Sequence, residues 1–234
     1  MKKPKSGPAF IEYYRKFPRV EAIWDDATRK LRRELLERGF PYPCEGVYFR
    51  VFKDEEIVEL WLMQDDGTYG LWDTYPICAM SGSLGPKRRE GDGQIPEGFY
   101  CIERFNPMSR YHLSLGIDYP NASDRILGDP VEPGTDIFMH GGCVTVGCIP
   151  ITDAGIEEPF ILAMLTRGQG QQVNPFHIFP ARLTDPMLSA LSERFDDEGL
   201  TRFWQNLQPG YQIFEETHIP PVPAVDSATG LYIW

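Results

Sequence analysis

Two side chains that can carry out nucleophilic chemistry lie close together, His140 and Cys148, in the segment HGGCVTVGC at residues 140–148. A cysteine attacks as the thiolate, and a free thiol holds little of that form at neutral pH without a base or a positive field. A histidine across a tight turn is such a base. Glycines at 141, 142 and 147 allow a sharp turn and a close approach to a substrate. The pattern predicts acyl transfer with Cys148 as nucleophile and His140 as base, and Gly147 and Cys148 amides directed at the developing oxyanion.

The residues of this segment also fit two structural interpretations. His140, Cys143 and Cys148 are three candidate zinc ligands, although no paired set at zinc spacing occurs elsewhere. Cys143 and Cys148 can instead pair as a disulfide, which would silence the nucleophile and allow oxidation to switch it off. A third alternative makes Cys143 a buried or half-buried thiol. The spacing alone leaves these interpretations open.

The other three cysteines have apolar or aromatic neighbours, a setting typical of buried, inert thiols. They are Cys44, Cys78 and Cys101. With only five scattered cysteines, the chain does not resemble a small domain held by a disulfide framework. His177, in the apolar run PFHIFP, is predicted to be a core histidine.

The elements around this segment are predicted to be strands in the middle and helices at both ends. Residues 19–38 have apolar side chains at helical spacing, and residues 47–63 read as a hairpin. After Cys148, Thr152 or Asp153 can cap a helix. Further helices are expected at 186–195 and 200–207, followed by an irregular Pro-rich tail at 219–234. The fold class is therefore mainly β with flanking helices (α+β). We divide it into an N-terminal helical extension at 1–45, a catalytic domain at 46–183, and C-terminal helices and tail at 184–234 packed on the same domain.

The net charge and the distribution of apolar residues limit which classes of function are possible. The formal net charge of −11 argues against nucleic acid as a partner, because an acidic surface gains nothing from counterion release. No apolar stretch approaches the roughly 20 residues that a membrane span needs. The first residues are basic but no apolar core of a signal peptide follows them. We expect either a cytoplasmic protein or one whose leader has been removed from this sequence.

The segment HGGCVTVGC resembles the catalytic motif of the L,D-transpeptidase (YkuD-type) family, and in particular its YafK-like branch. His140-Gly141 and Thr145-Val146-Gly147-Cys148 match the motif. Three further stretches resemble that branch: LGPK…REGD…PEGFY at 84–100, YPN…DR at 119–125, and FW-NL-GY-FE-TH at 203–218. The likeness covers about residues 19–222. Unlike most of the family, this chain has Ile149-Pro150 where an arginine usually follows the cysteine.

The resemblance implies a sandwich-like, mostly β catalytic domain that acts in the periplasm or cell envelope on peptidoglycan stem peptides. It implies Cys148 as nucleophile, His140 as general base and then acid, and no metal or organic cofactor. Gly147, Thr145 and Gly141 would form the turn and the oxyanion hole, and a backbone carbonyl would orient His140. Tyr119, Asn121, Arg125 and Cys143 are candidate substrate-binding residues.

Three functions follow as expectations. The first is a murein L,D-transpeptidase, in which Cys148 attacks the L-centre carbonyl of diaminopimelate and an amine resolves the thioester. The second is a hydrolase with the same chemistry that cleaves a diaminopimelate-linked bond, for example between murein and a protein. The third, from another class, is a non-catalytic murein-binding module; a zinc-held structural domain is a further alternative.

Overall fold

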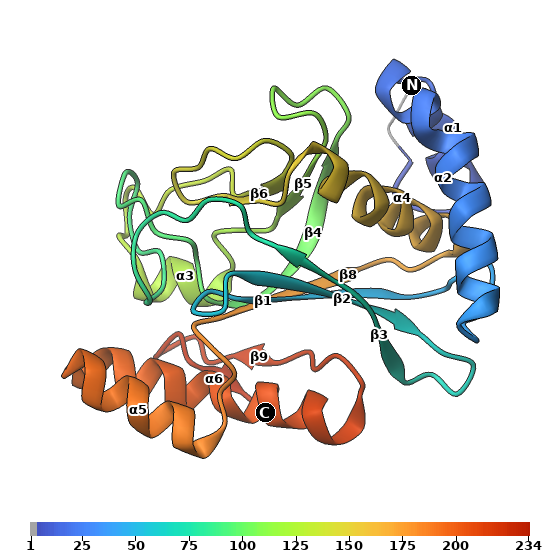
Figure 1. Ribbon diagram of the computed structural model, residues 1–234. Coiled ribbons are helices and arrows are strands. Elements are labelled where there is room, and N and C mark those ends of the chain that lie inside the picture. The colour runs from blue at the N-terminus through green and yellow to red at the C-terminus, as the bar shows by residue number, and fades with distance from the viewer. Residues whose placement is uncertain (1–3) are drawn as a thin grey trace.

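The computed structural model describes residues 4–234 of the chain. Its centre is an eight-stranded sheet in the order β3-β2-β1-β8-β4-β5-β6-β7, which curls as it crosses the molecule (Figure 1). The predicted α+β class, with helices flanking a β unit, is confirmed. The strands are β1 (Val47–Phe52), β2 (Ile57–Met63), β3 (Tyr69–Pro76), β4 (Gly98–Asn106), β5 (Ser114–Ile117), β6 (Phe138–His140), β7 (Ile149–Pro150) and β8 (Asn174–Phe179).

Helices cover both faces of the sheet (Figure 1). α4 packs on one face together with α1 and α2, and α5 and α6 lie on the other. The helix predicted at 19–38 is confirmed as α2, and Thr152 caps α4 through a hydrogen bond that its hydroxyl accepts from Gly155 N–H. The helices are α1 (Pro8–Arg15), α2 (Pro18–Glu37), α3 (Ala122–Leu127), α4 (Asp153–Gln169), α5 (Asp185–Phe195) and α6 (Glu198–Thr217).

β1 shows why both faces need a cover. All of its residues are buried, so the side chains that alternate along it must pack on two sides. Val47, Phe49 and Val51 belong to the core cluster that includes α1, α2 and α4. Phe52 belongs to the cluster formed with α5 and α6. The strand therefore separates two apolar layers rather than a core and a solvated face.

A buried ion pair connects the C-terminal helices to the sheet. Lys53 Nζ lies 2.9 Å from Glu97 Oε1, and both side chains are fully buried. Glu97 Oε2 accepts a hydrogen bond of 2.7 Å from Trp204 Nε1 of α6. Removing one partner of such a buried network typically costs about 3–5 kcal/mol. The C-terminal helices thus share a core with the sheet, whereas the exact domain boundaries stay predictions.

Two further segments have regular structure outside the main sheet. α3 follows Tyr119-Pro120, because Asn121 and Asp124 cap its first turn reciprocally. The tail is less irregular than predicted: β9 (Ala224–Val225) pairs with β10 (Tyr232–Ile233), and Tyr232 is buried against Phe99. Burial of the Tyr232 ring in the core thus holds the end of the chain in place.

His177 is buried as predicted, and its Nδ1 lies 2.7 Å from the Tyr48 hydroxyl. Among residues 4–234, no helix is both long and apolar enough to cross a membrane. The prediction about a signal peptide concerned the first residues of the chain, and residues 1–3 among them lie outside the described residues.

Candidate active site

The strand register places His140 and Cys148 on the same face of the sheet. β6 and β7 run parallel, with Met139 opposite Ile149. Cys148, one residue before Ile149, therefore lies beside Phe138, and paired residues of neighbouring strands point to the same face. Because side chains alternate along a strand, Phe138 and His140 share that face as well. The eight residues between His140 and Ile149 fold back so that the two reactive side chains flank one site.

His140 and Cys148 line a common cavity of about 260 Å³. The register also explains why Ser114 and Asn106 line this cavity, because Ser114 of β5 is paired with His140 on one side and with Asn106 on the other. The remaining side chains come from the β4–β5 loop and from the residues that lead into β6. Beside the predicted pair, the cavity wall includes Asn106, Arg110, Tyr111, Ser114, Asp136 and Phe138.

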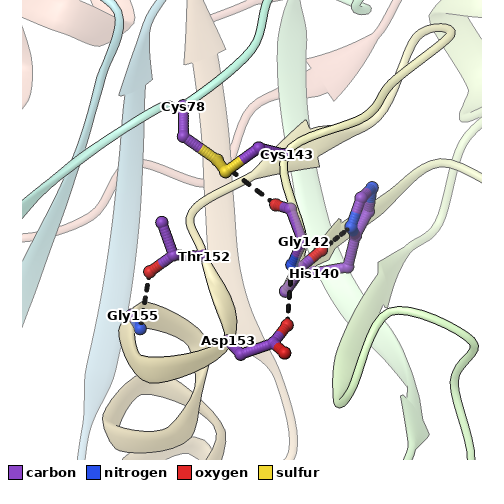
Figure 2. Close-up of a disulfide and its surroundings, with 8 residues drawn as sticks. Cys78, His140, Gly142, Cys143, Thr152, Asp153 and Gly155 are labelled. Carbon is purple, nitrogen blue, oxygen red and sulfur yellow. Dashed lines mark hydrogen bonds between the residues drawn. A yellow bond between two sulfur atoms is a disulfide. The ribbon is translucent and has the colours of Figure 1, made fainter.

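The imidazole of His140 is held in one tautomer. Its Nδ1 donates a hydrogen bond to the backbone carbonyl of Gly141 (Figure 2), so Nε2 carries the lone pair. The ring of Tyr111 stacks on it, with centroids 4.6 Å apart. Burial lowers the pKa of His140 below its ordinary value of 6.5, although the Gly141 carbonyl opposes this shift. His140 is thus a neutral base at pH 7, oriented by a backbone carbonyl as the resemblance implied.

Cys148 rests as a thiol. Its Sγ lies 3.6 Å from the carbonyl oxygen of Asp136, to which it donates a weak hydrogen bond. Burial raises the pKa of the Cys148 thiol above 9.0; the Asp136 carboxylate raises it further, while a Phe138 backbone hydrogen bond and Lys87 lower it. Two neutral groups therefore face the cavity, and the thiolate forms only when a base removes the proton. This arrangement suits general-base activation rather than a preformed ion pair.

The turn before Cys148 uses its own side chains to satisfy its amides. Thr145 Oγ1 accepts a hydrogen bond of 2.8 Å from Cys148 N–H and donates one of 2.7 Å to the Cys148 carbonyl. Gly147 N–H donates to Ser81 Oγ at 2.7 Å. Both amides predicted for the oxyanion hole thus donate to hydroxyl groups of the fold, and a role for them in binding an oxyanion stays a prediction. Buried amides need partners, and the hydroxyls of Thr145 and Ser81 supply them.

The start of the turn has no room for larger residues. A Cβ atom on Gly141 would lie 2.4 Å from Asp153 Oδ1 and 2.8 Å from the Tyr111 carbonyl oxygen. Gly142 has φ +70°, and its N–H donates to Asp153 Oδ1 at 2.8 Å (Figure 2). Asp153 is the first residue of α4, so the helix that covers the sheet also anchors the turn.

A disulfide joins Cys78 to Cys143 and connects this turn to the segment that follows β3 (Figure 2). The bond corrects two predictions: Cys143 pairs with Cys78 rather than Cys148, and Cys78 is no inert thiol. It also removes Cys143 from the candidate zinc ligands, because a disulfide sulfur has no thiolate to offer. The His140 ring points away from the disulfide. Cys148 stays free, as do Cys44, which is buried, and Cys101.

The opposite wall is the loop between β4 and β5, which the sequence did not single out. Arg19 of α2 donates to the carbonyl oxygens of Ser109 and His112, the latter at 2.6 Å. His112 Nε2 lies 2.8 Å from Glu157 of α4. Tyr111, between them, accepts a backbone hydrogen bond from Gly141 N–H. α2 and α4 thereby hold the loop whose Tyr111 ring stacks on the base.

The three predicted substrate-binding residues of the 119–125 stretch lie outside the cavity wall. Tyr119 is buried and donates its hydroxyl hydrogen to the Pro133 carbonyl. Asn121 caps α3 and also donates to the Phe99 carbonyl. Arg125 is exposed on α3. These contacts give Tyr119 and Asn121 a structural role, and a role in substrate binding stays a prediction for all three.

Comparison with known proteins gives the chain a family. The Escherichia coli K12 protein named "Putative L,D-transpeptidase YafK" is 39% identical over 189 residues, which cover 80% of this chain and 73% of that protein. The protein of the same name from Escherichia coli O157:H7 matches equally. No family model matches the sequence. Among solved structures, the helical cell shape determining protein Pgp2 of Campylobacter jejuni (K307A mutant) has a TM-score of 0.48 and 21% identity, and the match covers 74% of this chain and 63% of that one. On the strength of its sequence relatives, the chain belongs to the YafK family of L,D-transpeptidase-like proteins.

Proposed function

We propose that the protein is a murein L,D-transpeptidase that works through a thioester on Cys148. The observation that carries this proposal is the neutral pair in one cavity: His140 with Nδ1 bound to the Gly141 carbonyl, and Cys148 as a thiol. This tautomer leaves Nε2 free to accept the proton of the thiol. The family relationship supports the reaction class.

In the first half of the reaction, the thiol turns from the Asp136 carbonyl to His140 Nε2, which removes its proton. Cys148 Sγ then attacks the carbonyl at the L-centre of diaminopimelate in a stem peptide. The C–N bond to the next residue breaks, the released amine takes the proton from His140, and a thioester remains. Because Tyr111 stacks on the imidazole, the ring keeps its position as it changes charge.

In the second half, the side-chain amine of another stem peptide attacks the thioester. His140 accepts a proton from this amine and returns one to the leaving sulfur, which restores the resting pair. The peptide bond formed balances the one broken, so the reaction needs no redox partner and no cofactor.

The site of action that we propose is the periplasm or cell envelope. The Cys78–Cys143 disulfide supports this placement, because such bonds persist in oxidising compartments and are rare in the reducing cytosol. The bond lies in the turn that carries the reactive residues, so folding of this turn and export to an oxidising environment would go together.

The test is incubation of the protein with a murein tetrapeptide fragment, beside a Cys148→Ala control, followed by mass analysis of the products. Cross-linked dimers made by the wild type alone would support the proposal. Shortened fragments without dimers would assign the hydrolase alternative, in which water resolves the thioester. No change in the fragment, with Cys148 shown to be reduced, would contradict both enzymatic functions and favour a murein-binding module.

A further inference from the structure

The cavity contains a cation that the proposed mechanism does not use. Arg110 lines the wall opposite Cys148 and is exposed. In the described part of the chain, its guanidinium has no ion pair and no side-chain hydrogen bond, whereas the neighbouring Arg104 is paired with Asp136. Since that pair neutralises the carboxylate of the cavity, Arg110 leaves the site with a local positive charge.

The surroundings of Arg110 fix its backbone close to the reactive groups. It lies between Ser109, whose carbonyl oxygen is bound by Arg19, and Tyr111, whose ring stacks on His140. Arg110 therefore lies in the chain directly between these two contacts, and it lines the same cavity as the base.

The turn that carries Cys148 supplies no cation of its own, and Lys87, which lowers the pKa of Cys148, is paired with Asp92. Residues 141–150 contain neither lysine nor arginine, and Ile149 and Pro150 directly after the nucleophile are buried in β7. The protein as a whole carries a formal charge of −11, which repels an anionic ligand at a distance. A carboxylate that enters this site needs a local partner, and guanidinium is the group that binds carboxylates in a bidentate geometry.

We propose that Arg110 binds a free carboxylate of the substrate next to the carbonyl that Cys148 attacks. This inference rests on the proposed function, because it takes a stem peptide as the ligand. Such a peptide has two carboxylates near the scissile bond: one at the far centre of the diamino acid and one at the C-terminus of the residue that leaves. Arg110 acts as a specificity residue in either case, since it selects peptides in which that carboxylate is free.

The experiment measures binding without turnover, in the Cys148→Ala protein by calorimetry at pH 7. Three tetrapeptides are compared: one with both carboxylates free, one with the diamino-acid carboxylate converted to an amide, and one with the C-terminal carboxylate converted to an amide. We expect one of the two amides to bind roughly 10- to 100-fold more weakly than the free peptide, as is typical for the loss of a charge-assisted hydrogen-bond pair. Which amide binds weakly identifies the carboxylate that is recognised.

Arg110→Gln should abolish this discrimination, and Arg110→Lys should retain part of it. Arg202→Gln, which changes an exposed arginine of α6, is the matched control and should discriminate like the parent. Equal binding of all three peptides, absence of binding, or full discrimination in Arg110→Gln would overturn the inference. The proposed function fails separately, when protein that contains Cys148 forms no thioester; loss of discrimination in Arg110→Gln would then still assign carboxylate binding to this site.

Discussion

The two walls of the cavity are held by different kinds of interaction. The 140–148 turn is fixed covalently through Cys143, by Asp153 at the start of α4, and by the paired hydrogen bonds of Thr145. The β4–β5 loop is held by hydrogen bonds from Arg19 and by the contact of His112 with Glu157. The wall that carries the base and nucleophile is thus the rigid one, and the wall that carries Tyr111 and Arg110 is the more adjustable one. Precise geometry is needed for proton transfer, whereas recognition tolerates small movements.

Loss of the base on the rigid wall should slow the reaction most. His140→Gln should lower the rate of Cys148 acylation about 10²- to 10⁴-fold, because general-base assistance is lost. His218→Asn, which changes a histidine at the end of α6, is the control and should acylate normally. An acylation rate in His140→Gln within a factor of a few of wild type would show that His140 is not the base.

The pH dependence of Cys148 acylation also tests whether His140 is the base. Since burial lowers the pKa of His140, the base is already neutral in mildly acidic solution, and the acylation rate should be level from about pH 7 downward until His140 protonates below its ordinary 6.5. In His140→Gln the rate should instead rise with pH, toward and above the ordinary thiol value of 9.0, because the pKa of Cys148 is raised. The rate at which iodoacetamide alkylates Cys148, followed over a pH series in wild type and in His140→Gln, measures both pH dependences. A preformed thiolate would react quickly at pH 6 in either protein.

The covalent restraint on the rigid wall should contribute strongly to stability. Cys78→Ala is expected to lower the free energy of unfolding by about 2–4 kcal/mol, the usual range for a disulfide that closes a long loop. Urea unfolding of wild type with and without dithiothreitol, beside Cys78→Ala, measures this effect. The reductant should destabilise the wild type and leave the variant unchanged. An equal response of both proteins would mean that the disulfide does not restrain the fold.

A smaller effect is expected when the covalent bond is kept and the turn is crowded. Gly141→Ala places a Cβ 2.4 Å from Asp153 Oδ1, so the turn must shift away from α4. We expect a loss of about 1–3 kcal/mol, as for overpacking elsewhere, together with slower acylation. Gly170→Ala tests the alternative that any glycine loss has this effect, because its Cβ meets nothing within 4 Å although its φ is +111°. Unchanged acylation in Gly141→Ala would argue that the position of the turn is not critical.

The smallest effect should come from the adjustable wall. Arg19→Ala removes the hydrogen bonds to the Ser109 and His112 carbonyl oxygens and should cost about 1 kcal/mol. Because Tyr111 and Arg110 lie between these anchors, the apparent substrate affinity should fall several-fold while the rate of acylation at saturation stays near wild type. Steady-state kinetics with a murein fragment separate the two. A fall in the saturated rate alone would reverse the roles that we assign to the walls.

The sequence predicts the rigid wall better than the adjustable one. His140 and Cys148 lie eight residues apart around glycines, so local spacing is enough to bring them together, and Thr152 marks the next helix. The β4–β5 loop, in contrast, reaches the site through the pairing of Ser114 with His140. Such pairing depends on strand order, which local periodicity does not contain.

Two contacts of the 140–148 turn with distant parts of the chain could not be predicted, for the same reason. Cys143 pairs with Cys78, 65 residues away, because the edge of the sheet and the segment after β3 meet only in the folded chain. Ser81 likewise comes from a distant loop to accept a hydrogen bond from Gly147 N–H, a contact that local spacing does not contain. For Cys143, proximity along the chain thus favoured Cys148, whereas the folded chain brings it to Cys78.

The decisive experiment on the role of Cys148 is to measure the intact mass of the protein after exposure to a murein tetrapeptide or a carbapenem. It should be made on wild type, Cys148→Ala and His140→Gln in parallel, with peptide mapping of the modified site. We expect a thioester adduct on Cys148 in wild type, none in Cys148→Ala, and slow formation in His140→Gln. An adduct that persists in Cys148→Ala, or none in a reduced and folded wild type, would show that Cys148 is not the nucleophile.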